Sequence, residues 1–165
     1  MRWHLKSLHL STLLLMLAAC DQASNDTAGN VDQIEILPAI ESAKDFGDYV
    51  VHLNALGTNQ LTPDIAREYC IARTRYGAMI TLSVLKKEAG STSRAVSAEI
   101  TVSAVNLTGQ LKSIQIREIT EDDSIYYIGE TTIANQESLI YTVNIIPSGE
   151  SDPLVVRFQQ QFFVD

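Results

Sequence analysis

From about residue 45 onward, apolar side chains recur at every second position in a series of short segments. Because successive side chains of a strand point to opposite faces, this period of two indicates strands with one buried face. Leu139, Tyr141, Val143 and Ile145 form the clearest core-facing row. The pattern predicts about seven strands, at residues 48–55, 78–86, 98–105, 111–119, 125–132, 138–146 and 154–164.

Polar segments rich in turn-forming residues separate most of the later strands. These segments are residues 107–110, 121–124, 134–137 and 148–152. Short connections of this kind join antiparallel neighbours, so the chain is predicted to be all-β, an antiparallel sandwich of two sheets. A small closed barrel is the alternative.

One short helical insertion is expected at residues 62–70. Thr62 can cap the helix, and Pro63 suits the first helical position because its missing N–H would be unpaired there anyway. Ile65 and Tyr69 are four residues apart and are expected to face the core together.

Composition and charge exclude two classes of protein. With 45% hydrophobic and 19% charged residues among 165, the chain has the composition of a folded protein and not of a disordered one. Its 12 basic and 20 acidic residues give a formal net charge of −8. A nucleic-acid partner is therefore not expected, since phosphate binding requires an excess of Lys and Arg.

The N-terminus has the features of an export signal. Arg2 and Lys6 precede an apolar run at residues 8–19, which is too short to span a bilayer but suits a signal peptide. The run ends in Leu17-Ala18-Ala19-Cys20, which resembles the bacterial lipobox, whose cysteine is acylated before cleavage and becomes the new N-terminus. An ordinary signal peptide cut after Ala19 is the alternative.

The lipobox predicts three parts: a signal peptide at residues 1–19, the lipidated Cys20 with a flexible tether at 20–44, and a β-domain at 45–165. Cleavage removes two of the 12 basic residues, so 10 remain against 20 acidic ones and the net charge becomes −10. The lipid makes the membrane a partner. Asp21 resembles the signal that retains lipoproteins in the inner membrane, so we expect the chain to face the periplasm of a Gram-negative cell, at the inner membrane in preference to the outer one.

With the strands placed, several short motifs match a known family in order and spacing. They include Phe46-Gly47-Asp48-Tyr49, Asn106-Leu107-Thr108-Gly109-Gln110, Ile125-Tyr126-Tyr127-Ile128 and Phe158-Gln159-Gln160-Gln161-Phe162. The chain resembles the exported proteobacterial proteins grouped as domain of unknown function 4426, over roughly residues 45–165. The resemblance implies an immunoglobulin-like sandwich and a periplasmic location, and it implies no activity.

Few residues suited to catalysis or metal binding remain once residues 1–19 are cleaved off. His52 is the one histidine left, no GxSxG turn is present, and Cys70 is the one cysteine besides Cys20. Nucleophilic triads need a base beside the nucleophile, and soft-metal sites need clusters of His, Met or Cys. We therefore predict no catalytic residue, no metal site and no cofactor. Cys70 is expected to be a small buried thiol, with an intermolecular disulfide as the alternative.

The candidate residues for a ligand or partner site are His52, Asn54, Arg73, Arg75 and Tyr76. His52 and Asn54 share the outer face of a strand, and arginine forks suit carboxylates, phosphates or acidic surfaces. The simpler interpretation is that both arginines form salt bridges with the domain's own carboxylates.

The C-terminal strand offers a second surface, because its alternating glutamines indicate a half-exposed edge that a partner could pair with. These features favour a non-catalytic binding or interaction module, and its oligomeric state stays open. The alternatives are an enzyme with a pocket around His52 that includes a carboxylate or Cys70, and a passive structural lipoprotein of the envelope.

Overall fold

The computed structural model describes residues 36–37, 43–90 and 92–164. All of them belong to one compact unit, Gln33–Asp165. The predicted signal peptide and Cys20 lie outside the described residues. Within the described ranges, no helix combines the length and the apolar composition that crossing a membrane requires.

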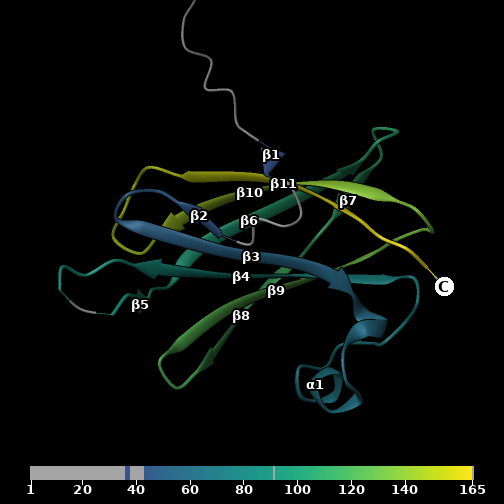
Figure 1. Ribbon diagram of the computed structural model, residues 1–165, viewed down its shortest axis with the longest axis horizontal. Coiled ribbons are helices and arrows are strands. Elements are labelled where there is room, and N and C mark those ends of the chain that lie inside the picture. The colour runs from purple at the N-terminus through teal and green to yellow at the C-terminus, as the bar shows by residue number, and fades with distance from the viewer. Residues whose placement is uncertain (1–35, 38–42, 91, 165) are drawn as a thin grey trace, which may run out of the picture. The chain divides into compact units, whose positions relative to one another are not determined.

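Two sheets face each other, as Figure 1 shows. The first sheet has the order β1 (Ile36–Leu37), β11 (Leu154–Gln161), β10 (Ser138–Pro147), β6 (Ala98–Asn106) and β7 (Leu111–Ser113). The second has the order β2 (Ala43–Asp45), β3 (Tyr49–Gly57), β4 (Gly77–Lys86), β9 (Ser124–Thr132) and β8 (Ile116–Glu121), with β5 (Arg94–Ala95) also paired to β4. Neighbouring strands are antiparallel except β1 and β11. The predicted all-β sandwich is confirmed, and the barrel alternative is wrong.

The core lies between the two sheets and contains the predicted alternating rows. Leu139, Tyr141, Val143 and Ile145 of β10 are all 0% exposed. The Tyr141 ring stacks on Phe158 of β11, with ring centroids 4.7 Å apart. Facing them from the second sheet, β3 and β4 contribute the buried side chains of Val51, Leu53, Ile80, Leu82 and Val84. Burial of these apolar side chains is the main force that holds the two sheets together.

The Tyr141 hydroxyl is buried in this core without a hydrogen-bond partner among the described residues. Burial also raises the pKa of Tyr141, so the group stays neutral. Because an unpaired buried hydroxyl carries its desolvation cost without compensation, Tyr141→Phe is expected to raise the free energy of unfolding by about 1 kcal/mol. Urea denaturation measures this change.

Tyr127→Phe is the matched control for that substitution. The Tyr127 hydroxyl accepts a hydrogen bond from the Ala98 N–H at 2.7 Å and donates one to Glu118 at 2.8 Å. Losing these bonds is expected to lower the free energy of unfolding by about 1–2 kcal/mol. The interpretation would be wrong if both variants lost stability to the same extent.

The strand predicted at residues 111–119 is instead two strands in different sheets. β7 ends at Ser113 in the first sheet, and β8 begins at Ile116 in the second. The apolar residues are spaced by three at this point, from Leu111 to Ile114, so one straight strand could not place them on a single face. Leu111 is 67% exposed, whereas Ile114 is buried at the crossing between the sheets.

Gly129 makes room for this crossing. A Cβ at Gly129 would lie 2.5 Å from Ile114 and 2.6 Å from Ile116, and contacts that short cannot be accommodated without movement. The absence of a side chain in β9 therefore lets the chain pass from one sheet to the other against the core.

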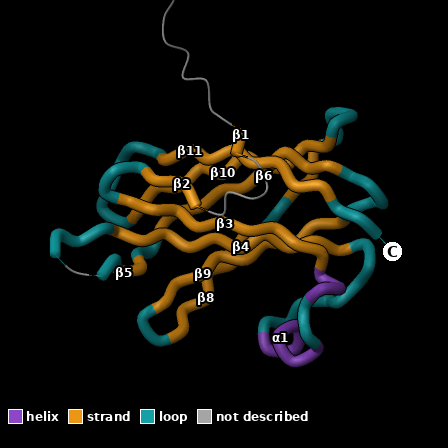
Figure 2. Tube along the Cα trace, viewed as in Figure 1, coloured by secondary structure: helices purple, strands orange, loops and turns teal. Residues whose placement is uncertain are grey.

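The helical insertion lies at one end of β3, where Figure 2 shows α1 below β3 and β4. It consists of η1 (Thr58–Gln60) and α1 (Pro63–Glu68), and the Thr62 hydroxyl caps α1 by accepting from the Ile65 N–H at 3.3 Å. The cap prediction is confirmed. The prediction that Ile65 faces the core is wrong, because Ile65 is 40% exposed. Tyr69 is half-buried against a second apolar cluster outside the main core.

The prediction of a buried thiol at Cys70 is also wrong. Cys70 is exposed, with a φ of 53°. Because α1 ends at Glu68, Cys70 lies in the turn that follows the helix, where the chain reverses in the left-handed region. The place of Cys70 in this turn leaves its thiol exposed.

Two predictions about the ends of the domain need correction. The segment 20–44, predicted to be a tether, contains β1 and the first residues of β2, because a two-residue strand is too short to be recognised by its period. The edge of β11 is not fully open either. β1 pairs with it in parallel at Arg157 and Phe158, so the chain itself covers part of the predicted edge.

Candidate functional site

The structure divides the five predicted site residues between two places. His52 and Asn54 are exposed on the outer face of β3, while Val51 and Leu53 point into the core, as the alternation predicts. Arg73, Arg75 and Tyr76 lie in the loop between α1 and β4. His52 and Asn54 line one hollow, and Tyr76 lines a different one, so the five residues do not form a single site.

The hollow beside His52 has a volume of about 220 Å³. Besides β3, Thr81 and Ser83 of β4 and Tyr126 of β9 line it, with neither a carboxylate nor a thiol among the lining residues. Ser83 lies opposite His52 in the β3–β4 register, but no hydrogen bond joins the two side chains. Over the described part of the chain, no group of three or more His, Cys, Asp or Glu side chains could hold a metal ion.

A more apolar hollow of about 320 Å³ continues from the His52 hollow and shares Thr81 and Tyr126 with it. The two hollows together are called the outer-face groove. Its apolar part has buried Met79 and Ile128 as its floor, with Ile65 from α1 and Tyr126 from β9 on its sides. Ile65 is 40% exposed and Tyr126 is 41% exposed, so both present apolar surface to solvent.

The end of α1 is fixed to β8 beside this groove. The Tyr69 hydroxyl donates a hydrogen bond of 2.7 Å to Glu121, and the Arg117 guanidinium donates to the Tyr69 carbonyl. The hydrogen bond to Glu121, followed by partial burial, raises the pKa of Tyr69 to about 12. The phenol therefore stays protonated and donates to the Glu121 side chain, which lines the groove.

Sequence reasoning missed the residues that form the apolar part of this groove. Tyr126 had a recognisable signal, because adjacent tyrosines in a strand point to opposite faces, and only one of Tyr126 and Tyr127 can enter the core. Tyr127 is 3% exposed, and Tyr126 is the outward one. The roles of Ile65 and Tyr69 had no such signal, since they depend on where the insertion packs.

The second group of candidate residues, in the α1–β4 loop, consists of Arg73, Arg75 and Tyr76. Arg73 donates a hydrogen bond of 3.1 Å to the carbonyl of Asn59, and among the described residues it forms no salt bridge of the kind that the simpler interpretation expected. The Arg75 guanidinium lies 5.8 Å from the centre of the Tyr76 ring. Tyr76 is 53% exposed and lines a third hollow, of about 540 Å³, together with residues of β7 and β9.

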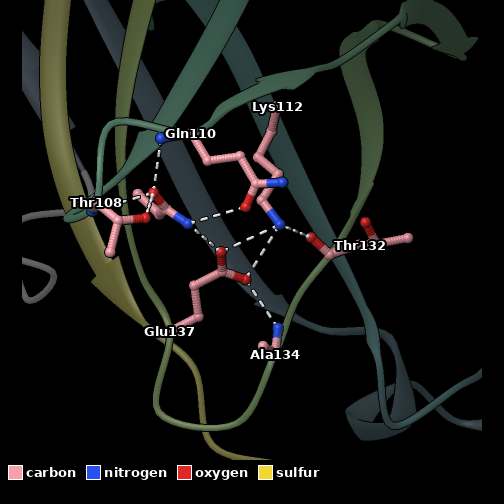
Figure 3. Close-up of polar contacts among 7 residues, drawn as sticks. Thr108, Gln110, Lys112, Thr132, Ala134 and Glu137 are labelled. Atoms are coloured by element: carbon pink, nitrogen blue, oxygen red, sulfur yellow. Dashed lines mark hydrogen bonds and ion pairs between the residues drawn. The ribbon is translucent and has the colours of Figure 1, made fainter.

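A polar cluster that the sequence did not reveal borders this third hollow, and Figure 3 shows it. The Glu137 carboxylate accepts hydrogen bonds from the Asn106 side chain at 2.9 Å and the Ala134 N–H at 2.8 Å, and the Lys112 ammonium lies 3.1 Å away. Lys112 also donates to the Thr132 carbonyl at 3.2 Å. The cluster thus ties β7 and the β6–β7 turn to the β9–β10 loop.

Hydrogen bonding decides the charge state of Glu137. Burial by itself would raise the pKa of this carboxyl, but the bonds from Asn106, Ala134 and Lys112 outweigh burial and leave the pKa below its ordinary value of 4.5. Glu137 is therefore ionised at neutral pH, and its charge offsets that of Lys112.

Residues 43–165 match the family described as domain of unknown function (DUF4426). The chain belongs to this family. A crystal structure of a DUF4426 family protein from Pseudomonas aeruginosa PAO1 is similar, with 27% sequence identity and a TM-score of 0.63. The match covers 74% of this chain and 94% of that one. No curated protein matches the chain.

In this DUF4426 domain, two of the motifs that carried the resemblance reach the sites described above. Tyr126, from the motif at residues 125–128, lies in the outer-face groove. Asn106, from the motif at residues 106–110, stabilises the turn that follows it. Its Oδ1 accepts hydrogen bonds from the N–H groups of Thr108 at 3.1 Å and Gln110 at 2.8 Å. The same side chain reaches Glu137 with its amide nitrogen.

Proposed function

We propose that the chain is a non-catalytic interaction module, held at the periplasmic side of a bacterial membrane by a lipid on Cys20. In this proposal the outer-face groove binds a segment of a partner protein. The observation that carries the proposal is the apolar half of the groove, where Ile65 and Tyr126 are exposed above a buried floor of Met79 and Ile128. Aromatic anchors beside an apolar pocket are typical of protein interaction surfaces.

Charge indicates the kind of segment that fits. Glu121 lines the groove, and Glu68 is close enough to contribute to the raised pKa of Tyr69. The whole chain has a formal net charge of −8. A partner segment with apolar side chains for the floor and a Lys or Arg beside Glu121 would match both features, and opposite charges would speed the encounter.

The lining of the groove favours binding over catalysis. Hydrolysis at His52 would need a nucleophile activated by the imidazole, or a carboxylate that orients it, within hydrogen-bond reach. The lining of the His52 hollow supplies the hydroxyls of Thr81, Ser83 and Tyr126, and none of them is hydrogen-bonded to His52. A face of this composition suits recognition.

Site-specific photo-cross-linking in the cells of origin tests the proposal. A benzoylphenylalanine at position 65 is expected to give a discrete cross-linked product, because Ile65 forms one side of the groove. The matched control is position 107, where Leu107 is also an exposed apolar residue, at 69%, but lies outside the groove. The proposal would be wrong if position 65 gave no product, or if position 107 gave the same product in equal yield.

A further inference from the structure

The third hollow lies between the α1–β4 loop, β7 and β9, and is called the end pocket. Its volume of about 540 Å³ lies within the usual range of small-molecule sites. Hydroxyl-bearing side chains make up much of its lining: Thr58, Thr74, Tyr76, Ser113, Thr131 and Thr132. The end pocket is separate from the outer-face groove, since the two have no lining residue in common.

Part of this lining is already fixed by internal hydrogen bonds. The Thr58 hydroxyl donates to the Thr74 carbonyl and accepts from the Thr74 N–H, each at 3.1 Å. The Thr74 hydroxyl in turn accepts from the Tyr76 N–H at 3.3 Å. These bonds fix the conformation of the loop that carries Tyr76, so little conformational entropy of the loop would be lost when a ligand binds.

Other polar groups of the lining have no partner among the described residues. The hydroxyls of Tyr76, Ser113, Thr131 and Thr132 make no hydrogen bond there, and all four side chains are at least partly exposed. The Gln110 amide uses its oxygen to accept from Asn106 at 3.2 Å, which leaves its two N–H donors available. A ligand in the end pocket would therefore meet several neutral donors and acceptors.

The charges of the end pocket do not select an anion. Lys112 is the basic residue of the lining, and its ammonium is paired with Glu137 at 3.1 Å, with both side chains largely buried. Glu130, also in the lining, is exposed and would repel an anion. The lining thus favours a neutral ligand with many hydroxyl groups.

The lining also has two large side chains with exposed apolar surface. Leu111 is 67% exposed, and Tyr76 is 53% exposed with the Arg75 guanidinium 5.8 Å from its ring centre, so each offers some apolar surface beside the hydroxyls. A sugar ring has this same combination, since its C–H groups form an apolar face and its hydroxyls form a polar rim. We propose that the end pocket binds a neutral oligosaccharide, with the Tyr76 ring against a sugar ring and the hydroxyl side chains at its rim.

The test uses the full processed chain, purified in a detergent without a sugar headgroup, and NMR titrations with maltotriose and N,N′,N″-triacetylchitotriose. We expect saturable binding of at least one trisaccharide. Tyr76→Ala is expected to weaken it about tenfold or more, and Tyr76→Phe, which keeps the ring, by no more than about threefold. Tyr126→Ala, in the outer-face groove, is the matched control and is expected to leave the dissociation constant unchanged.

Four results would overturn the proposal. The first is no binding of either trisaccharide at concentrations up to about 10 mM, a weak affinity limit. The others are equal affinity in Tyr76→Ala, equal loss in Tyr126→Ala, and tighter binding of inorganic phosphate than of both sugars. Ser113→Ala gives a second test on the opposite side of the end pocket and is also expected to weaken binding. The sugar could come from the polymeric glycan of the cell wall or from a free oligosaccharide. Co-sedimentation with purified cell-wall sacculi distinguishes the two, because the protein would sediment with the sacculi only if it binds the wall glycan.

Discussion

Glu137→Ala is expected to lower the free energy of unfolding by about 3–5 kcal/mol, the usual cost of breaking a buried ion pair. The substitution removes the acceptor of three groups at once: the Asn106 amide, the Ala134 N–H and the Lys112 ammonium. The side chains of Lys112 and Glu137 are only 13% and 9% exposed, so water would solvate the orphaned ammonium poorly. Urea denaturation of the variant and the unsubstituted chain gives the difference.

Glu99→Ala is the control for this prediction. Glu99 is an exposed glutamate of β6 that makes no hydrogen bond or ion pair among the described residues. Its replacement is expected to change stability by no more than about 0.5 kcal/mol. Equal losses in the two variants would show that the cluster around Glu137 does not tie the loops together.

The same carboxylate gives the protein a predictable pH dependence. The pKa of Glu137 is lower in the folded chain than its ordinary value of 4.5, because the hydrogen bonds to its carboxylate outweigh burial. Its contribution to stability is therefore complete above pH 4.5 and is lost as the pH falls through the folded pKa. Glu137→Gln, which cannot titrate, is expected to lose less stability on acidification below pH 4.5. A parallel loss in the two proteins would contradict this.

Cys20→Ser is expected to stop maturation altogether. A serine has no thiol to receive the lipid, and in the lipoprotein pathway cleavage follows acylation, so residues 1–19 should remain attached. Intact-mass measurement of the protein from cells should find the unmodified precursor for Cys20→Ser, and for the unsubstituted chain a polypeptide that begins at an acylated Cys20.

Cys70→Ser is the matched control, because Cys70 is the other cysteine of the chain. Its side chain is exposed, and it lies far from the signal peptide in the sequence. It should mature normally. If Cys20→Ser were also cut after Ala19, the chain would carry an ordinary signal peptide, and the membrane anchor in the proposed function would be wrong.

The strands were predictable because their signal is local. In β10, for example, Leu139, Tyr141, Val143 and Ile145 alternate with more exposed neighbours, and this alternation alone indicates which side is buried. The crossing from β7 to β8 was harder to predict, since a change of sheet depends on what lies opposite. Gly129, fifteen positions after Ile114, provides the space for it.

The sites were less predictable because they join residues distant in sequence. The outer-face groove exists because α1 packs beside the outer face of β4 and β9, which brings Ile65 near Tyr126. The polar cluster joins Asn106 to Glu137 across 31 positions. The exposed positions of His52 and Asn54, in contrast, follow directly from the alternation of β3 and were predicted correctly.

The central claim is that the outer-face groove, and not the surface of the sandwich in general, contacts a partner. The most direct measurement is the yield of the cross-linked product from position 65 in chains that also carry Tyr126→Ala or Tyr76→Ala. Both tyrosines are exposed, at 41% and 53%, but only Tyr126 lines the groove. A tyrosine anchor typically contributes about 2 kcal/mol or more to binding, so Tyr126→Ala should nearly abolish the product while Tyr76→Ala leaves it unchanged. Equal yields from the two chains would contradict the claim.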